Sequence, residues 1–273
     1  HAGHRALQCL VKEDMVVGNV IASINKIDCE ICALSKAKRR SFPLSPNPPA
    51  RHPMDLVHFD FCEVGEPGYQ GELYSLTIID DHSDAKFAIT MKARKEVAMH
   101  FKKWLVQAER MSDRKLKCVR CDNAKEFKEG RMKELLDELG VEYELTEPYK
   151  HEQAGKVERA NRTLLEKAHC MLSESNLVLK YWSYAFKAAE FVANRTPVTG
   201  RGKTPLELFS GIKPSVRMIR VFGSVCYAKK YEKVSKGRFK IRPRAEKCVL
   251  LGYTQGGHSY IVQNVDTKRI YSC

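Results

Sequence analysis

The chain has 273 residues, of which 43% are hydrophobic and 29% are charged, and its formal net charge at pH 7 is +14. This length and hydrophobic content suit one large domain or two to three small ones with a genuine core, and they exclude a disordered tail. No apolar run reaches the roughly 18 to 20 residues of a membrane span, and the N-terminus lacks a signal-peptide pattern, so we expect an intracellular, soluble protein.

The positive charge is concentrated in the last third of the chain. Residues 1–55 carry 8 Lys and Arg against 5 Asp and Glu, residues 56–175 carry 20 against 23, and residues 176–273 carry 19 against 5. This distribution indicates a polyanionic partner, because each phosphate that a protein neutralises releases condensed counterions. The alternative is a basic surface that serves only solubility.

Residues 1–36 are predicted to form a small helical zinc-binding module. Apolar residues recur at helical steps, and Cys29 and Cys32 follow them in a CxxC pattern. A structural zinc site needs four nitrogen or sulfur ligands, and His1 and His4 are available as the nitrogen ligands. A buried cysteine pair in a helical hairpin is the alternative.

The composition changes after this module. Five of the eleven prolines lie between Pro43 and Pro53, behind a basic start at Lys38, Arg39 and Arg40. Such a segment disfavours both helix and sheet, so we predict a stiff basic linker over residues 37–54.

Residues 55–213 are predicted to form an α/β unit with trailing helices. In the strand predicted over Lys117–Cys121, side chains alternate, so Cys118 and Cys121 diverge and are not expected to share a metal. Gly140 is expected to end a helix, and an apolar stripe from Tyr181 to Val192 indicates a core helix. The predicted strands are Asp55–Glu63, Glu72–Asp80, Ala85–Met91, Lys117–Cys121 and Val141–Leu145, and the predicted helices are Glu96–Met111, Gly130–Leu139 and Gln153–Ser173.

Three acidic residues of this unit are candidates for a catalytic role. Asp60 and Asp122 each end a short β-prone run, and 35 residues separate Asp122 from Glu158. Glu158 lies on the last predicted helix, whose apolar positions from Val157 to Leu172 fall at three- and four-residue steps. That pattern buries one face of the helix and leaves Glu158 accessible.

The spacing of the three acids, with Arg-Cys-Asp-Asn-Ala-Lys-Glu-Phe around the second and Val-Glu-Arg-Ala-Asn-Arg-Thr-Leu around the third, resembles a retroviral-type integrase core. The likeness extends over nearly the whole chain and is greatest to the copia class of LTR retrotransposons. It implies an RNase H-like catalytic core, a mixed five-stranded sheet with helices, flanked by the zinc-binding module and a β-rich basic C-terminal module. Asp60 would lie on the central strand, Asp122 just past the fourth strand, and Glu158 on the helix that follows.

Clustered carboxylates repel one another, so this arrangement indicates bound divalent cations. Oxygen ligands suit Mg2+ or Mn2+, and two such ions would clamp a phosphodiester. We therefore predict that Asp60, Asp122 and Glu158 are the catalytic residues and the metal ligands. Asp80 and Asp81 end the second strand, where the resemblance implies a structural role.

Polar residues beside these acids are predicted to hold DNA. The loop Glu147–Gly155 corresponds to a mobile DNA-contacting loop of similar integrases. Asn161 either contacts a phosphate or packs in the helix interface. The predicted contacts are Asn123, Lys150, Gln153, Lys156, Arg159 and Arg162.

Residues 214–273 are predicted to form a basic, β-rich module that resembles a small β-barrel. Between Lys229 and Lys247 the chain carries nine Lys and Arg against two acids, with Tyr231 and Phe239 interleaved, which is typical of contact with DNA. A solvated hairpin is the alternative. Short strands are expected at Val249–Tyr253, Ser259–Asn264 and Arg269–Tyr271. The predicted DNA contacts are Lys229, Lys230, Lys236, Arg238, Lys240, Arg242 and Arg244.

The resemblance implies the DNA integrase of an LTR retrotransposon, which uses Mg2+ or Mn2+ to process 3′ ends and to transfer element DNA into target DNA. Such a protein self-associates on DNA and works in the nucleus after a cytoplasmic particle stage. The family's first zinc-ligating histidine would precede residue 1 and its chain continues past residue 273, so both terminal modules are expected to be truncated.

Two alternatives stay open. One is a catalytically inactive or domesticated integrase-derived DNA-binding protein, and the other is an RNase H-like nuclease that only hydrolyses. The family's glycine after the second acid is Ala124 here, and its loop proline and asparagine are His151 and Ala154. These departures favour the inactive protein, whereas the three intact acids favour the enzyme.

Overall fold

The computed structural model describes residues 50–121, 130–145, 151–198, 201–229, 244–254 and 256–273. The chain divides into two compact units, and all of these residues belong to the second, Pro48–Cys273. Several predicted site residues lie outside the described part: His1, His4, Cys29, Cys32, Asp122, Asn123, Lys150, Lys230, Lys236, Lys240, Arg238 and Arg242, together with the side chain of Gln153. The predicted domain boundaries at residues 36, 54 and 213 stay predictions.

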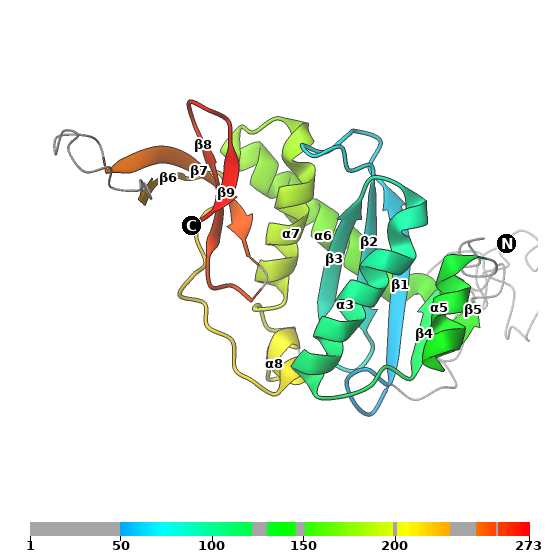
Figure 1. Ribbon diagram of the computed structural model, residues 1–273. Helices are drawn as coiled ribbons and strands as arrows, with labels where there is room; N and C mark the ends of the chain where they lie inside the picture. The colour runs from blue at the N-terminus through cyan, green and yellow to red at the C-terminus, as the bar shows by residue number, and fades with distance from the viewer. Residues whose placement is uncertain (1–49, 122–129, 146–150, 199–200, 230–243, 255) are drawn as a thin grey trace, which may run out of the picture. The chain divides into compact units, whose positions relative to one another are not determined.

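A mixed five-stranded sheet forms the centre of this unit (Figure 1), and its strands lie in the order β3-β2-β1-β4-β5. They are β1 (Leu56–Glu63), β2 (Tyr74–Asp80), β3 (Lys86–Met91), β4 (Cys118–Cys121) and β5 (Glu142–Leu145). Strand β1 pairs antiparallel with β2 and parallel with β4, so it is the central strand, as the resemblance implied. All five strands were predicted from the sequence, with starts one or two residues early.

Alternate side chains of β2 lie on opposite faces of the sheet and pack against different helices. Leu76 and Ile78 join the core that also contains residues of α3 (Val97–Ser112) and α5 (Arg131–Leu139). Thr77 and Ile79 instead face α6 (His151–Ser175). The short 3-10 helix η1 (Arg94–Glu96) precedes α3, and Gly140 ends α5 in the left-handed conformation at φ 63°, as predicted.

Helix α6 starts two residues earlier than predicted. It begins at His151, so the segment from His151 to Gly155 is helical, and the prediction of a loop through Gly155 is wrong. The local sequence explains this difference, because no proline follows Pro148 in this segment. In addition, Ala154 stands where the family has asparagine, and alanine has the strongest helix propensity.

Helix α7 (Trp182–Ala193) lies between two layers (Figure 1). It contacts α6 and β3 on one side and strand β7 (Ala245–Tyr253) on the other. More of the helix surface is therefore buried than the predicted apolar stripe, because Ser183, Tyr184 and Phe186 are buried as well. The 3-10 helix η2 (Leu179–Tyr181) leads into α7, and α8 (Pro205–Ser210) follows it.

The C-terminal residues form a second, antiparallel sheet in the order β6-β7-β8-β9. Its other strands are β6 (Val225–Lys229), β8 (Tyr260–Asn264) and β9 (Ile270–Ser272), and the last three strands of the sheet lie where strands were predicted. The prediction that this module resembles a small β-barrel stays a prediction. Val249, Leu251 and Ile261 pack against the cluster around α7, whereas a second buried cluster lies among the strands themselves, formed by Ala228, Cys248, Leu250 and Val262.

No helix among the described residues is both long and apolar enough to cross a membrane.

Candidate active site

Asp60 lies near the middle of the central strand, on the sheet face that meets α6. Asn161 of α6 donates a hydrogen bond from Nδ2 to Asp60 Oδ2 at 2.7 Å. Thr77 is the β2 partner of Asp60, and its hydroxyl donates to Asn161 Oδ1. Because Thr77 is fully buried and Asn161 is only 6% exposed, this chain of bonds holds the Asp60 carboxylate in a defined orientation. It also favours the packing alternative for Asn161.

Glu158 lies one helical turn before Asn161. Val157 and Ala160 are buried against Ile79 of β2, and this contact turns Glu158 toward solvent. Side chains three positions apart on a helix have Cβ atoms roughly 5 to 6 Å from each other, so Glu158 neighbours the Asn161 amide that binds Asp60. The structure thus brings Asp60 against the helix that carries Glu158, and the meeting of the three predicted acids stays a prediction.

The third acid, Asp122, follows the last described residue of β4. Cys121 pairs with Phe59 of β1. In the sequence, Asp60 directly follows Phe59, and Asp122 directly follows Cys121. The register up to Cys121 is therefore the one that the predicted meeting of Asp60 and Asp122 requires. Within the described part, which omits Asp122, no three His, Cys, Asp or Glu side chains are close enough to share a metal ion.

Asp80 has a structural role, as the resemblance implied. It accepts hydrogen bonds from the Met54 N–H at 2.8 Å, the Ser83 N–H at 2.8 Å and the Ser83 hydroxyl at 2.6 Å. Its side chain is fully buried, and this burial raises its pKa above the usual range for a carboxyl. Asp80 therefore stabilises the turn that follows β2 and is not exposed to a metal ion in solution.

The predicted DNA contacts on α6 differ in their surroundings. Arg159 and Arg162 are exposed, and Arg162 Nε lies 3.9 Å from Glu166 Oε1. Lys156 instead forms ion pairs with Asp81 and with Asp84, each at 3.0 Å. Lys229 and Arg244 of the C-terminal sheet region are exposed. Contact with DNA stays a prediction for all of these residues.

The second CxxC pair does not form a metal site. Val119 and Cys121 are buried on one face of β4, whereas Cys118 is half-buried on the other, as the alternation predicted. The Cys118 thiol forms no disulfide. Burial raises the pKa of Cys118 to about 11, with nearby Glu144 adding to the effect, so its thiol stays neutral and is a poor metal ligand.

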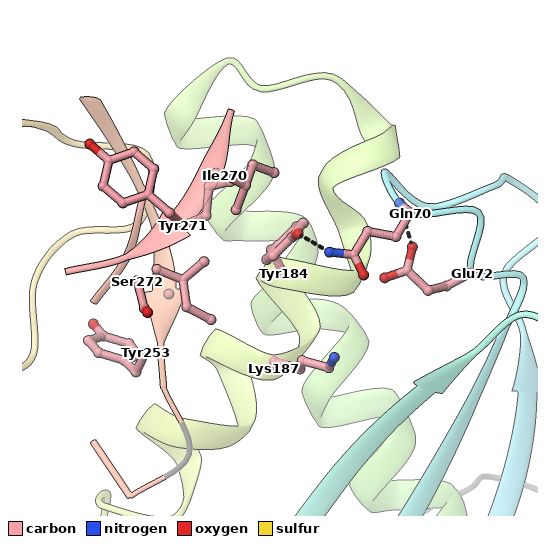
Figure 2. A pocket seen from close by; sticks show the side chains of 11 residues that line it. Gln70, Glu72, Tyr184, Lys187, Tyr253, Ile270, Tyr271 and Ser272 are labelled. Carbon is pink, nitrogen blue, oxygen red and sulfur yellow. Dashed lines mark hydrogen bonds between the residues drawn. The ribbon is translucent and has the colours of Figure 1, made fainter. Parts of the chain in front are cut away.

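A cavity of about 270 Å3 lies where α7 meets the second sheet (Figure 2). On one side, the Gln70 side-chain amide donates to the Tyr184 hydroxyl at 2.9 Å, and the Gln70 N–H donates to the Glu72 carboxylate at 2.9 Å. Tyr253, Ile270 and Tyr271 line the other side, and neither Asp60 nor Glu158 is among the lining residues. The cavity is therefore separate from the candidate active site.

Sequence reasoning missed Thr77, His58 and Asp84 as partners of the site residues. A threonine within the apolar run of β2 is a weak signal for Thr77, because β-branched residues are common in strands whatever their role. No sequence signal pointed to His58 or Asp84, since their contacts depend on how β1, α6 and the turn after β2 meet.

Comparisons with known proteins agree with this geometry. A family model for the integrase core domain matches residues 50–151, a range that contains Asp60 and Asp122. The chain is 28% identical over 274 residues to the retrovirus-related Pol polyprotein from transposon TNT 1-94 of Nicotiana tabacum, an alignment that covers 99% of this chain and 20% of that polyprotein. It is 23% identical over 248 residues to the corresponding polyprotein from transposon RE1 of Arabidopsis thaliana, covering 90% of this chain and 16% of the polyprotein.

A solved structure supports the fold. A chain of the simian T-cell lymphotropic virus intasome in complex with PP2A regulatory subunit B56 gamma superposes with a TM-score of 0.53 at 16% identity, covering 89% of this chain and 84% of that chain. The sheet order and the match over residues 50–151 make this part of the molecule similar to retroviral-type integrase cores. The two polyprotein alignments confirm the predicted resemblance to the integrase region of a retrotransposon Pol polyprotein, and the chain spans about a fifth of those relatives' length.

Proposed function

We propose that this chain is a Mg2+- or Mn2+-dependent polynucleotidyl transferase, which trims the 3′ ends of element DNA and joins them to target DNA. The observation that carries the proposal is the hydrogen bond of 2.7 Å from Asn161 to Asp60. This bond ties the central strand to the helical turn that presents Glu158. Asp60 and Glu158, which come from two distant segments, would then meet at one face of the sheet.

The side chains present fit hard divalent cations. Asp60 is half-buried and Glu158 is exposed, so both offer carboxylate oxygens at a solvent-facing site. Asp60, Asp122 and Glu158 would hold the ions, which when bound activate the attacking hydroxyl and stabilise the leaving oxygen. Asn161 orients the Asp60 carboxylate, and the exposed guanidinium groups of Arg159 and Arg162 would meet backbone phosphates.

The partner that best matches the charge of the chain is DNA, both element ends and target. The 19 Lys and Arg of residues 176–273, against 5 acids, support binding to a polyanion. Self-association on DNA ends, a site of action in the nucleus after a cytoplasmic particle stage, and membership of the copia class follow from the resemblance. Zinc binding by His1, His4, Cys29 and Cys32 rests on the CxxC pattern and on the resemblance.

An oligonucleotide strand-transfer assay in Mn2+ tests the proposal, with DNA binding measured on the same samples. We expect Glu158→Gln to bind DNA like the wild type and to lose joining, because the amide removes a metal-binding charge. Glu174→Gln is the matched control, since Glu174 is also exposed on α6 but lies far along the helix. Absence of joining by every variant would support the inactive DNA-binding alternative, and hydrolysis without joining would support the nuclease.

A further inference from the structure

We propose that Asp81 is a positioning residue, which through His58 and Lys156 fixes the strand that carries Asp60 against the helix that carries Glu158. The inference rests on the proposed function, because it concerns the placement of that function's acids.

The two contacts meet on one oxygen atom. His58 Nε2 lies 3.0 Å from Asp81 Oδ1, and Lys156 Nζ donates to the same Oδ1, also at 3.0 Å. His58 precedes Asp60 by two residues on β1, so the two side chains leave the same face of the sheet. Lys156 precedes Glu158 by two residues on α6. One carboxylate therefore holds both catalytic elements, at the same sequence distance from each acid.

The contacts are enclosed, which makes them strong. His58 is 3% exposed, and the side chains of Asp81 and Lys156 are 14% and 23% exposed. The Ala50 N–H donates to the other carboxylate oxygen of Asp81 at 2.8 Å. Burial opposes ionisation of Asp81, but the bonds from His58, Ala50 and Lys156 outweigh it and hold its pKa well below the usual range. Charges so enclosed are screened little by salt.

A second acid strengthens the tie to α6. Lys156 Nζ is also 3.0 Å from Asp84 Oδ1, and Arg201 holds the other Asp84 oxygen at 3.0 Å. Lys156 therefore spans two acids of the turn after β2, while Arg201 neutralises the outer one. The ammonium of Lys156 is occupied within the protein, which distinguishes it from the exposed Arg159 on the same helix.

Two attachments then flank Glu158 along the helix. Lys156 binds the turn after β2 just before it, and Asn161 binds Asp60 one turn after it. Two fixed points determine how far α6 is rotated about its axis, and this rotation sets the distance from the Glu158 carboxylate to Asp60. Metal sites tolerate errors of only about 0.5 Å in such placements.

The test uses the full chain and Mn2+ alone, without DNA, and follows binding through the electron paramagnetic resonance signal of the free ion. We expect Lys156→Met to raise the Mn2+ concentration for half-saturation by about 10- to 100-fold, the range seen when groups that support metal ligands are removed. Lys156→Arg keeps the cation and should restore most of the affinity. Arg201→Met is the matched control, because it removes a cation from Asp84 without detaching α6.

Mn2+ binding by folded Lys156→Met that equals that of the wild type would overturn the proposal. So would a loss of DNA affinity with Mn2+ binding unchanged and a salt slope reduced by about one, since that result would make Lys156 a phosphate contact. Asp81→Asn is measured in parallel, so that a failure of Lys156→Met to fold leaves a decisive variant: wild-type Mn2+ affinity in Asp81→Asn contradicts the inference.

Glu158→Gln separates this inference from the proposed function. If Glu158→Gln binds Mn2+ and joins DNA like the wild type, the proposed function fails. If Glu158→Gln loses both properties while Lys156→Met and Asp81→Asn lose neither, the proposed function stands and only the positioning role fails.

Discussion

Among single residues, Asn161 has the greatest influence on the geometry of the site. Its amide joins Thr77 and Asp60, which lie 84 and 101 residues away in sequence. Helical spacing predicted that position 161 could face the core, but it could not name a partner on a strand so distant. For the same reason Lys156 was predicted as a DNA contact, whereas the structure pairs it with Asp81 and Asp84.

Asn161→Ala is expected to destabilise the chain by about 1 to 3 kcal/mol, because the buried Thr77 hydroxyl loses its acceptor. Urea unfolding measures the change. Arg162→Ala, on the exposed neighbouring residue, should stay within about 0.5 kcal/mol of the wild type. Equal stabilities of the two variants would show that the Thr77–Asn161–Asp60 chain contributes nothing to the fold.

Glu190 gives the folded chain a specific pH dependence. Burial raises its pKa from 4.5 to about 7 despite the nearby charges of Arg195 and Lys187 and the hydrogen bond from Asn194. The folded state therefore binds this proton more tightly than the unfolded state. The resulting stabilisation is complete below the unfolded pKa and is lost as pH rises through the folded pKa.

Glu190→Gln removes this titration. The melting temperature of the variant should rise relative to that of the wild type as pH increases from about 4.5 to about 7, and the difference should then level off. Glu174→Gln, on an exposed residue, is the control that makes the same substitution at the surface. A Glu190→Gln difference that does not change with pH would refute this account of Glu190.

At the scale of helices and strands, the sequence was most informative where one face of an element is buried. The period of α6 correctly placed Val157, Leu164, Ala168 and Leu172 in the core. The second buried face of α7 was not predicted, because it is created by β7, which lies more than fifty residues later. The packing of the C-terminal sheet on α7 was not predicted for the same reason.

Gly223 tests how closely α6 and the C-terminal sheet are joined. Its φ is +77°, and a methyl group there would collide with Ser175 at the end of α6. Gly223→Ala should cost about 1 to 2 kcal/mol for the left-handed conformation and about 1 to 3 kcal/mol more for the collision.

Gly140→Ala separates these two costs in the same denaturation experiment. Gly140 also has a positive φ, +63°, but a methyl group there would meet no atom within 4 Å. Gly140→Ala should therefore show the conformational cost alone. A loss for Gly223→Ala no larger than that for Gly140→Ala would mean that the contact with Ser175 is loose.

For the whole molecule, the distribution of positive charge predicted a polyanionic partner, and the spacing of the acids predicted the class of reaction. Order and pairing of the central sheet were predictable because family motifs mark the ends of its strands. The contact of Asp60 with the helix that carries Glu158 was predictable only through that resemblance, since no local pattern shows that β1 meets α6.

Replacement of Lys236, Arg238 and Lys240 by Gln is expected to weaken DNA binding on all sequences and to reduce the salt slope by about one for each phosphate that the variant no longer neutralises. The matched control replaces three exposed basic residues of α3, Lys102, Lys103 and Arg110. Both variants remove the same positive charge. Equal decreases in affinity would show that binding follows net charge alone and not the basic C-terminal segment.

The central claim is that Asp60 and Glu158 share a site for divalent cations, and anomalous scattering from crystals grown in Mn2+ tests it most directly. The account predicts an anomalous peak within coordination distance, about 2.0 to 2.6 Å, of carboxylate oxygens of Asp60, with Glu158 directed at the same site. Glu158→Gln crystals should show a weaker peak. Mn2+ bound elsewhere, with no peak beside Asp60 at saturating concentration, would contradict the account.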